Sequence, residues 1–198
     1  MFVYVVARDF GFAPNPFGGT CSLATCKPEI RRLAQLDEWV IGTGSKKHGR
    51  QHSIVYAMRV TETITFDEYW SDPRFQFKKP HFRSGKKHGY GDNIYRKVGG
   101  EWSQLDSHHS KEDGSPNPLN ITTDTRVSRV LLSDDYVYWG RAGPTIPGHL
   151  LKFQGEDLLI VRGQRHRISD QHQAALVDWI RSCDQTGYCG TPLEWRHK

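Results

Sequence analysis

The sequence predicts an α+β domain built around a compact, mostly antiparallel β-sheet or barrel, with a few helices and long loops. About six short segments of its 198 residues show the alternation or apolar run of a strand, and only two show helical periodicity. Strands and helices do not alternate regularly, which argues against a doubly wound parallel sheet. We find no internal repeat and no dividing linker, so residues 1–198 are predicted to form a single domain.

The first half of the chain contains three predicted strands and one helix. Residues 1–9 alternate like a strand, and residues 10–20 form an irregular loop rich in glycine and proline. Pro28 suits the first position of a short helix. Residues 38–44 and 54–60 predict two further strands, the second apolar enough to be buried on both faces.

The second half begins with a long segment without periodicity, residues 71–120, which we predict to be loop. Strands are predicted over 126–132, 136–140 and 158–161. Ser169 suits the N-cap of a final helix whose apolar residues recur three and four positions apart.

Composition excludes several classes of protein. The chain is 36% hydrophobic and 12% aromatic with a formal net charge of +5, which excludes collagen, coiled coil and wholesale disorder. Its apolar runs are far shorter than the ~20 residues that a membrane span needs, and its start lacks the pattern of a signal peptide. We therefore expect a cytoplasmic protein with no membrane partner, whose four cysteines are thiols.

The positive charge is concentrated between residues 74 and 97. This segment contains eight Lys and Arg residues but only one acidic residue, and Phe and Tyr residues lie between the charges. Cations among flat side chains suit a nucleic acid or a nucleotide, because the cations contact phosphate and the rings stack on bases. The alternative is a solvated loop that Phe75 and Phe77 anchor to the core. The candidate nucleic-acid contacts are Lys78, Lys79, Arg83, Lys86 and Lys87.

Cys26 is the strongest candidate nucleophile, because it precedes Lys27 and Pro28 at a predicted helix start. A neighbouring cation and a helix N-terminus both lower the pKa of a thiol. The alternative is a small buried apolar residue. A four-cysteine zinc site is disfavoured, since the Cys21–Cys26 and Cys183–Cys189 spacings are wider than usual, and we predict no metal and no cofactor.

His108 and His109 lie in a polar segment with several acidic residues, which offers material for acid–base chemistry or for a metal. Paired histidines at a surface often do neither. The motifs of the standard nucleotide-binding and hydrolase families are missing from the sequence. An aromatic slot for a base, with edge hydrogen bonds from groups such as Asn93 or Asp124, is a further hypothesis. Its candidate walls are Trp39, Tyr69, Trp70, Trp102, Tyr138 and Trp139.

Several blocks of the sequence resemble the nucleotide modification associated domain 2 family, and the similarity spans nearly the whole chain. They are Gly11-Phe12-Ala13-Pro14-Asn15-Pro16-Phe17, Cys21-Ser22-Leu23-Ala24-Thr25-Cys26-Lys27-Pro28, Trp39-Val40-Ile41-Gly42-Thr43-Gly44, Phe66-Asp67-Glu68-Tyr69-Trp70 and Tyr136-Val137-Tyr138-Trp139-Gly140. The resemblance implies a role in systems that make, recognise or remove modified nucleobases in bacteriophages and bacteria. More distantly, the chain looks like the PUA, EVE and ASCH group of small barrels, many of which hold a modified base in a slot.

Three functions remain open at this point. The first is a PUA-like module that recognises a modified nucleobase in DNA or as a nucleotide. The second is an enzyme acting on modified nucleotides or DNA, with Cys26 as nucleophile or with His108 and His109 as acid–base groups. The third is an interaction subunit with protein partners in a modification or defence complex. The candidate ligand-binding residues are Asn15, Lys27, Arg31, Trp39, Tyr138 and Trp139.

Overall fold

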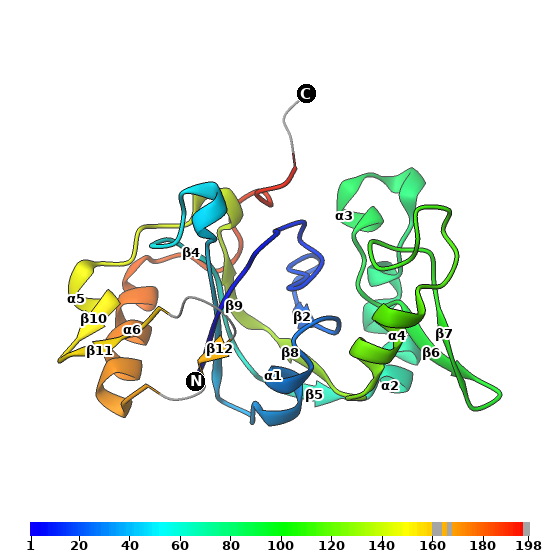
Figure 1. Ribbon diagram of the computed structural model, residues 1–198, viewed down its shortest axis with the longest axis horizontal. Helices are drawn as coiled ribbons and strands as arrows, with labels where there is room; N and C mark the ends of the chain where they lie inside the picture. The colour runs from blue at the N-terminus through cyan, green and yellow to red at the C-terminus, as the bar shows by residue number, and fades with distance from the viewer. Residues whose placement is uncertain (160–163, 166–167, 196–198) are drawn as a thin grey trace. The chain divides into compact units, whose positions relative to one another are not determined.

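The computed structural model describes residues 1–159, 164–165 and 168–195. The chain forms two compact units, each assembled from separate stretches of sequence (Figure 1). Unit 1 comprises Met1–Asp9, Ala34–Val60 and Asp135–Lys198, and unit 2 comprises Phe10–Leu33 and Thr61–Asp134. Helices and several small sheets occur together without regular alternation, which confirms the α+β class.

Unit 1 is built on a six-stranded sheet with the order β12-β1-β3-β4-β9-β13. The β1–β3 and β9–β13 pairs are parallel, and the other pairs are antiparallel. The sheet is open in the described part of the chain, because its edge strands do not pair with each other, so the barrel form of the prediction does not apply. The strands are β1 (Phe2–Val5), β3 (Trp39–Thr43), β4 (Ile54–Arg59), β9 (Asp135–Tyr138), β12 (Gln164–Arg165) and β13 (Gly187–Tyr188).

Helix α6 (Asp170–Ser182) packs on this sheet, with Leu176 and Ile180 in one buried cluster with Ile41 and Val137. Ser169 caps the helix, its Oγ accepting a hydrogen bond from the His172 amide at 3.3 Å. The shorter elements of unit 1 are η1 (Lys46–His48), η4 (Gly140–Ala142), α5 (Gly148–Leu151) and the β10 (Lys152–Phe153) to β11 (Glu156–Asp157) hairpin.

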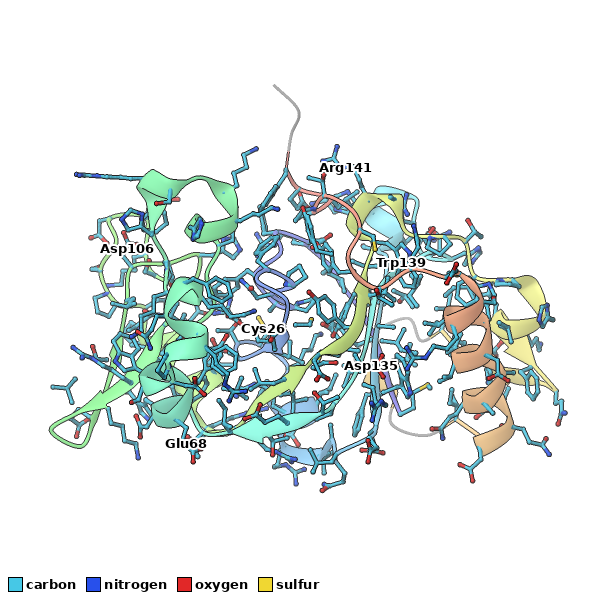
Figure 2. All side chains as sticks on the ribbon, turned by 180° about the vertical axis from the view of Figure 1, so that it is seen from behind. Cys26, Glu68, Asp106, Asp135, Trp139 and Arg141 are labelled. Atoms are coloured by element: carbon cyan, nitrogen blue, oxygen red, sulfur yellow. The ribbon has the colours of Figure 1, made fainter. Side chains whose placement is uncertain are left out.

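Ion pairs tie strand β9 to its neighbours in unit 1. Asp135, labelled in Figure 2, accepts hydrogen bonds from Arg59 of β4 at 2.7 Å and from Arg181 of α6 at 2.6 Å. These two arginines hold the pKa of Asp135 below its usual range.

Unit 2 contains an antiparallel sheet with the order β2-β8-β5 and a separate β6–β7 hairpin. Its core is rich in aromatic side chains, among them Phe12, Phe66, Tyr69 and Tyr95. The strands are β2 (Cys21–Leu23), β5 (Glu62–Ile64), β6 (Tyr95–Val98), β7 (Glu101–Gln104) and β8 (Val130–Ser133). The helices are α1 (Pro28–Leu33), α2 (Phe66–Ser71), η2 (Pro73–Lys78), η3 (Phe82–Ser84), α3 (Lys86–Gly89) and α4 (Pro118–Thr125).

The strands predicted over 38–44 and 54–60 and the final helix are confirmed, and the strands over 126–132 and 136–140 are confirmed in part. The prediction of continuous loop over 71–120 is wrong, because this segment contains η2, η3, α3, β6, β7 and the start of α4. These elements are too short for periodicity. Side chains cap η2 and α4, whereas η3 and α3 have no side-chain cap. Asp72 caps the amide of Arg74 at 2.8 Å, for example. The strand predicted over 158–161 lies partly outside the described residues, and Leu158 and Leu159 are not in a strand.

None of the helices in the described part of the chain is both long enough and apolar enough to cross a membrane.

Candidate active site

Cys26 lies on a strained turn between strand β2 and helix α1 of unit 2. Its φ is +59°, and that of Lys27 is +40°. Residues other than glycine rarely adopt this left-handed backbone conformation. Backbone strain of this kind is concentrated at functional sites. A strand, a strained residue and a helix in succession also present the nucleophile in enzymes with a nucleophile elbow.

Two side chains hold the backbone of Cys26 in this conformation. Its amide donates to Asp124 Oδ1 at 2.8 Å, and its carbonyl accepts from Arg31 Nε at 2.9 Å. The Arg31 guanidinium also donates to the carbonyls of Val127 at 2.7 Å and Arg129 at 2.8 Å. Arg31 is completely buried, and burial lowers its pKa to about 10 although Asp124 acts in the opposite direction. The Cys26 turn is therefore fixed to the residues that follow helix α4.

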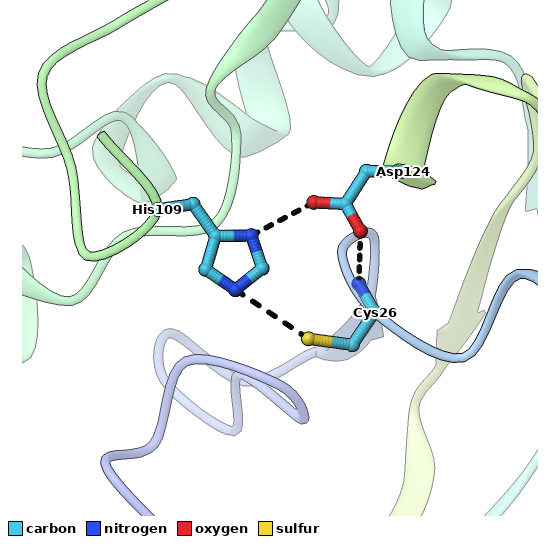
Figure 3. Close-up of side chains that lie close together, drawn as sticks. All are labelled: Cys26, His109 and Asp124. Carbon is cyan, nitrogen blue, oxygen red and sulfur yellow. Dashed lines mark hydrogen bonds and ion pairs between the residues drawn. The ribbon is translucent and has the colours of Figure 1, made fainter. Parts of the chain in front are cut away.

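His109 lies between the Cys26 thiol and the Asp124 carboxylate (Figure 3). Its Nε2 is 3.5 Å from Cys26 Sγ, and its Nδ1 is 2.8 Å from Asp124 Oδ2. The hydroxyl of Tyr95 donates to the same Oδ2 at 2.9 Å. Both carboxylate oxygens of Asp124 are thus used, one by the Cys26 amide and the other by His109 and Tyr95.

Hydrogen bonds to its backbone fix the segment that carries His109. Its carbonyl accepts from Asn120 Nδ2 at 2.7 Å and from Gln104 Nε2 at 3.3 Å. Gln104 also donates to the Tyr95 hydroxyl at 3.1 Å, which connects this support to Asp124. The ring of Phe12 packs against the imidazole with centroids 4.7 Å apart. The contacts of the two ring nitrogens, the Phe12 ring and the hydrogen bonds to the His109 backbone together fix the orientation of the imidazole.

The electrostatics of the cluster favour a protonated imidazole. Burial by itself lowers the pKa of His109, but the hydrogen bonds and charges of Asp124 and Cys26 raise it to about 9. Burial, together with the Asp124 charge, raises the pKa of Tyr95 well above its usual value, so this hydroxyl keeps its proton and donates a hydrogen bond to the carboxylate.

The three side chains are placed to act as a nucleophile (Cys26), a base (His109) and a carboxylate that orients the base (Asp124). His109 Nε2 is placed to take the thiol proton, and Asp124 fixes the tautomer and stabilises the imidazolium that results. Helix α4 starts at Pro118 after the cap Asn117, whose Oδ1 accepts from the Leu119 amide at 3.1 Å, and this places Asp124 in its last turn.

Cys26, His109 and Asp124 also have ligand atoms close enough together to hold a metal ion, within 4.8 Å of one another. The hydrogen bonds favour the triad over a metal. Asp124 is bonded directly to His109 Nδ1, which is the position of a second carboxylate behind a metal-bound histidine. Only Cys26 Sγ and His109 Nε2 would then remain as direct ligands, whereas catalytic zinc takes three from the protein.

His108 points to a different part of unit 2. Its ring contacts Phe10 at 4.4 Å, Phe12 at 5.3 Å and Tyr90 at 5.5 Å between centroids, and it lines a cavity of about 660 Å³. The other lining residues are Phe82, Gly85, Lys86, Gly89, Tyr90, Asp106, Ser107, Ser110, Lys111 and Glu112.

The predicted ligand-binding residues are divided between the two units, with Asn15, Lys27 and Arg31 in unit 2. Asn15 is buried in unit 2, where it donates to the Tyr90 carbonyl at 2.9 Å and accepts from Lys78 Nζ at 2.9 Å. Arg31 holds backbone carbonyls, as described above. Lys27, next to Cys26, is half-buried, and burial lowers its pKa.

The aromatic candidates Trp39, Tyr138 and Trp139 belong to unit 1. Tyr138 is buried and donates to Asp9, Trp139 is buried and donates to Gln185, and Arg181 lies over the Trp39 ring at 5.0 Å. Of the other slot candidates, Tyr69 is in the core of unit 2. The candidate walls of the aromatic slot predicted from the sequence are therefore divided between the two units.

The basic segment is only partly a cationic surface. Lys78 is 1% exposed and donates to Asn15 and Ser22, so it does not belong to the exposed cations. Lys79 lies over the ring of Trp70 at 4.0 Å. Arg83, Lys86 and Lys87 are exposed, and Lys86 lines the cavity beside His108.

Sequence reasoning missed the contacts of Asp124 with His109 and Cys26, and the supports Tyr95 and Gln104. From the sequence, Asp124 is predicted only as a group that could bond the edge of a base. The spacing of Cys26, His109 and Asp124 along the chain has no local pattern, because their meeting depends on the tertiary structure. An acidic residue in a short helix after Asn117-Pro118 was the only available signal.

A family model described as nucleotide modification associated domain 2 matches residues 1–198, the entire chain. No curated protein and no solved structure matches it.

Proposed function

The chain belongs to the nucleotide modification associated domain 2 family, and on that premise we propose that it is a thiol-dependent enzyme of nucleotide modification with Cys26 as its nucleophile. The observation that supports the proposal is the arrangement of Cys26 Sγ 3.5 Å from His109 Nε2, with Asp124 2.8 Å behind the imidazole. A domain that only recognises a base needs no thiol on a strained turn beside an oriented imidazole. We therefore favour the enzyme over a module that recognises a modified base without changing it.

Acyl transfer is the reaction that this geometry supports best. The sulfur of Cys26, having given its proton to His109, attacks the carbonyl carbon of an acyl group carried by an amino group of a nucleotide. A carbon–sulfur bond forms, the carbon–nitrogen bond breaks, and the imidazolium of His109 gives its proton to the departing amine. Water, activated by the same imidazole, then hydrolyses the thioester and restores the thiol.

The same residues serve the reverse direction, in which an acyl group is placed on the nucleotide. In that case the sulfur of Cys26 displaces the thiol of an acyl thioester donor, forming the new carbon–sulfur bond as the old one breaks, and His109 gives its proton to the departing thiol. The amino group of the base then replaces water in the second step. In both directions Asp124 and Tyr95 are positioning residues, because they act through His109. The substrate is a nucleotide, free or within nucleic acid.

Selective alkylation tests the proposed nucleophile. We expect iodoacetamide at pH 7 to modify Cys26 faster than Cys189, although Cys189 is the more exposed of the two thiols. Peptide mass spectrometry quantifies each site, with Cys26→Ser and Cys189→Ser as matched controls. We expect His109→Ala to slow the modification of Cys26 at least tenfold and to leave that of Cys189 unchanged. Equal rates at Cys26 in wild-type protein and His109→Ala would overturn the proposal.

A second experiment tests the chemistry. Incubation with N-acylated deoxynucleotides should give an acyl adduct, seen as an increased intact mass, in wild-type protein and none in Cys26→Ser. We expect a chelator to leave the adduct unchanged. Loss of the adduct with chelator and its recovery with zinc would replace the triad by a metal site on the same residues.

A further inference from the structure

We propose that the cavity beside His108 binds a single nucleotide, with its base stacked on the aromatic side chains and its one phosphate on the lysines. The connection to acyl transfer rests on the function proposed above, but the binding itself does not. The cavity lies entirely within unit 2. Its volume of about 660 Å³ is within the range of small-molecule sites, about 300–1,000 Å³.

Three rings line the cavity, those of Phe82, Tyr90 and His108. Phe82 is 58% exposed, so much of its ring surface is accessible to a ligand. Tyr90 and His108 are supported from behind by Phe10, at 5.3 Å and 4.4 Å between centroids. An exposed ring near two rings of fixed orientation is suited to a flat heterocycle, and each stacked base contributes about 1–3 kcal/mol.

The charges of the lining limit the ligand further. Lys86 and Lys111 supply two cations, and Asp106 and Glu112 supply two carboxylates. A balanced lining does not suit a polyphosphate, whereas it suits one phosphate together with amino or hydroxyl groups that donate to the carboxylates. Asp106, labelled in Figure 2, accepts from Ser110 Oγ at 2.7 Å, which fixes its orientation at the edge of the cavity.

The cavity is coupled to the triad through neighbouring side chains. His108 lines the cavity, and the next residue, His109, faces Cys26. The ring of Phe12 packs against both imidazoles, at 5.3 Å from His108 and 4.7 Å from His109. A base stacked on His108 would therefore lie one residue away from the general base. This gives His108 the role of a binding residue in place of the acid–base role predicted from the sequence.

Equilibrium binding in the Cys26→Ser background tests the cavity without any reaction. The probes are the four deoxynucleoside monophosphates, deoxyribose 5-phosphate and inorganic phosphate, measured by calorimetry. We expect at least one monophosphate to bind more tightly than both base-free probes. We expect Phe82→Ala to weaken that binding about 5- to 150-fold, as the loss of one stacking contact implies, and Lys111→Ala to weaken it at least threefold.

Matched variants outside the cavity provide the controls. Leu119→Ala removes an apolar side chain of unit 2 that is 79% exposed, and Lys152→Ala removes an exposed cation of unit 1, and we expect neither to change the affinity. Monophosphates that bind no better than inorganic phosphate, or that bind Phe82→Ala as tightly as the parent, would overturn the inference. Binding that is lost with Phe82 while Cys26 proves unreactive would keep the cavity and remove the proposed enzyme. A reactive Cys26 with no monophosphate binding would do the opposite.

Discussion

Unit 2 contains two buried polar clusters that share the segment around β2. They differ in whether a side chain remains able to react with a ligand. In one, Lys78 donates to Asn15 and Ser22, and Asp92 accepts from Ser22 at 2.7 Å and Tyr69 at 2.8 Å. In the other, Asp124 and His109 lead to the sulfur of Cys26. The first cluster is closed, because all three Nζ hydrogens and both carboxylate oxygens have partners within it. The second ends at a thiol that can react.

The two cysteines of this segment show the same difference. Cys21 is fully buried, and burial raises the pKa of its thiol to about 12 although the Lys78 charge opposes this. Cys26, five residues later, faces an imidazole that is positioned to take its proton. Similar residue types therefore give two different clusters. In the structural cluster every polar atom has a partner, whereas in the candidate catalytic cluster the Cys26 sulfur remains able to react with a substrate.

Lys78→Met is the change with the largest expected effect, and it breaks the closed cluster. It removes the charge that offsets the burial of the Asp92 carboxylate, and it takes one donor away from each of two Asn15 oxygens and the Ser22 hydroxyl. Each buried polar group that loses a partner costs about 1–3 kcal/mol, which gives a total of about 3 kcal/mol or more. We expect urea unfolding to show a loss of this size. Lys78→Met combined with Asp92→Asn should recover part of it. A loss below about 1 kcal/mol for Lys78→Met would show that the closed cluster does not support the fold.

The pH dependence of stability tests the open cluster. The pKa of His109 is raised from about 6.5 to about 9, so its contribution is complete below about pH 6.5 and is lost as pH rises through about 9. The shift corresponds to about 3 kcal/mol. We expect the free energy of unfolding of wild-type protein, relative to His109→Gln, to fall by this amount between pH 6 and pH 10.

Because other groups titrate in the same range, the control is Leu119→Ala, an exposed change in the same unit that removes no titratable group. Its stability should follow that of wild-type protein at every pH. Parallel curves for wild-type protein and His109→Gln would contradict the raised pKa.

Arg31→Lys sharpens the comparison by loosening the Cys26 turn while keeping the charge. A lysine cannot reproduce the planar fork that bonds the carbonyls of Cys26, Val127 and Arg129 at once. We expect a loss of about 2 kcal/mol in the free energy of unfolding. The rate of Cys26 alkylation in the folded protein should change as well, whereas Arg83→Lys, an exposed change in the same unit, should alter neither. An unchanged alkylation rate in Arg31→Lys would show that the turn keeps its geometry without this fork.

The sequence predicted the elements that local patterns specify. The alternation over 54–60 and the capped, periodic segment after Ser169 correspond to β4 and α6, because burial on a sheet or along one helix face imposes those periods. The segment 71–120 could not be predicted in this way. Asp72 caps η2, and Tyr95 and Trp102 of the β6–β7 hairpin pack with Phe66 in the core of unit 2, which are tertiary contacts that no local pattern shows.

The candidate site was predictable as separate residues and not as an arrangement. Cys26 and His109 could each be selected by residue type and local context, but they are 83 residues apart and Asp124 is 98 residues from Cys26. No local rule joins them. The net charge of residues 74–97 likewise carried no information on burial, and Lys78 was therefore placed among the surface cations although it lies in the core.

Neutralising the exposed cations has the smallest expected effect. It distinguishes cations that can contact phosphate from Lys78, which is buried. Arg83 and Lys87 are exposed, so each can contact one phosphate of a single-stranded oligonucleotide. We expect Arg83→Ala combined with Lys87→Ala to reduce the slope of log affinity against log salt by about 1.4, at about 0.7 per phosphate contact. Fluorescence anisotropy at several salt concentrations measures this slope, and Lys152→Ala in unit 1 is the control. A slope that stays the same in the double variant would mean that these two cations belong to a solvated face.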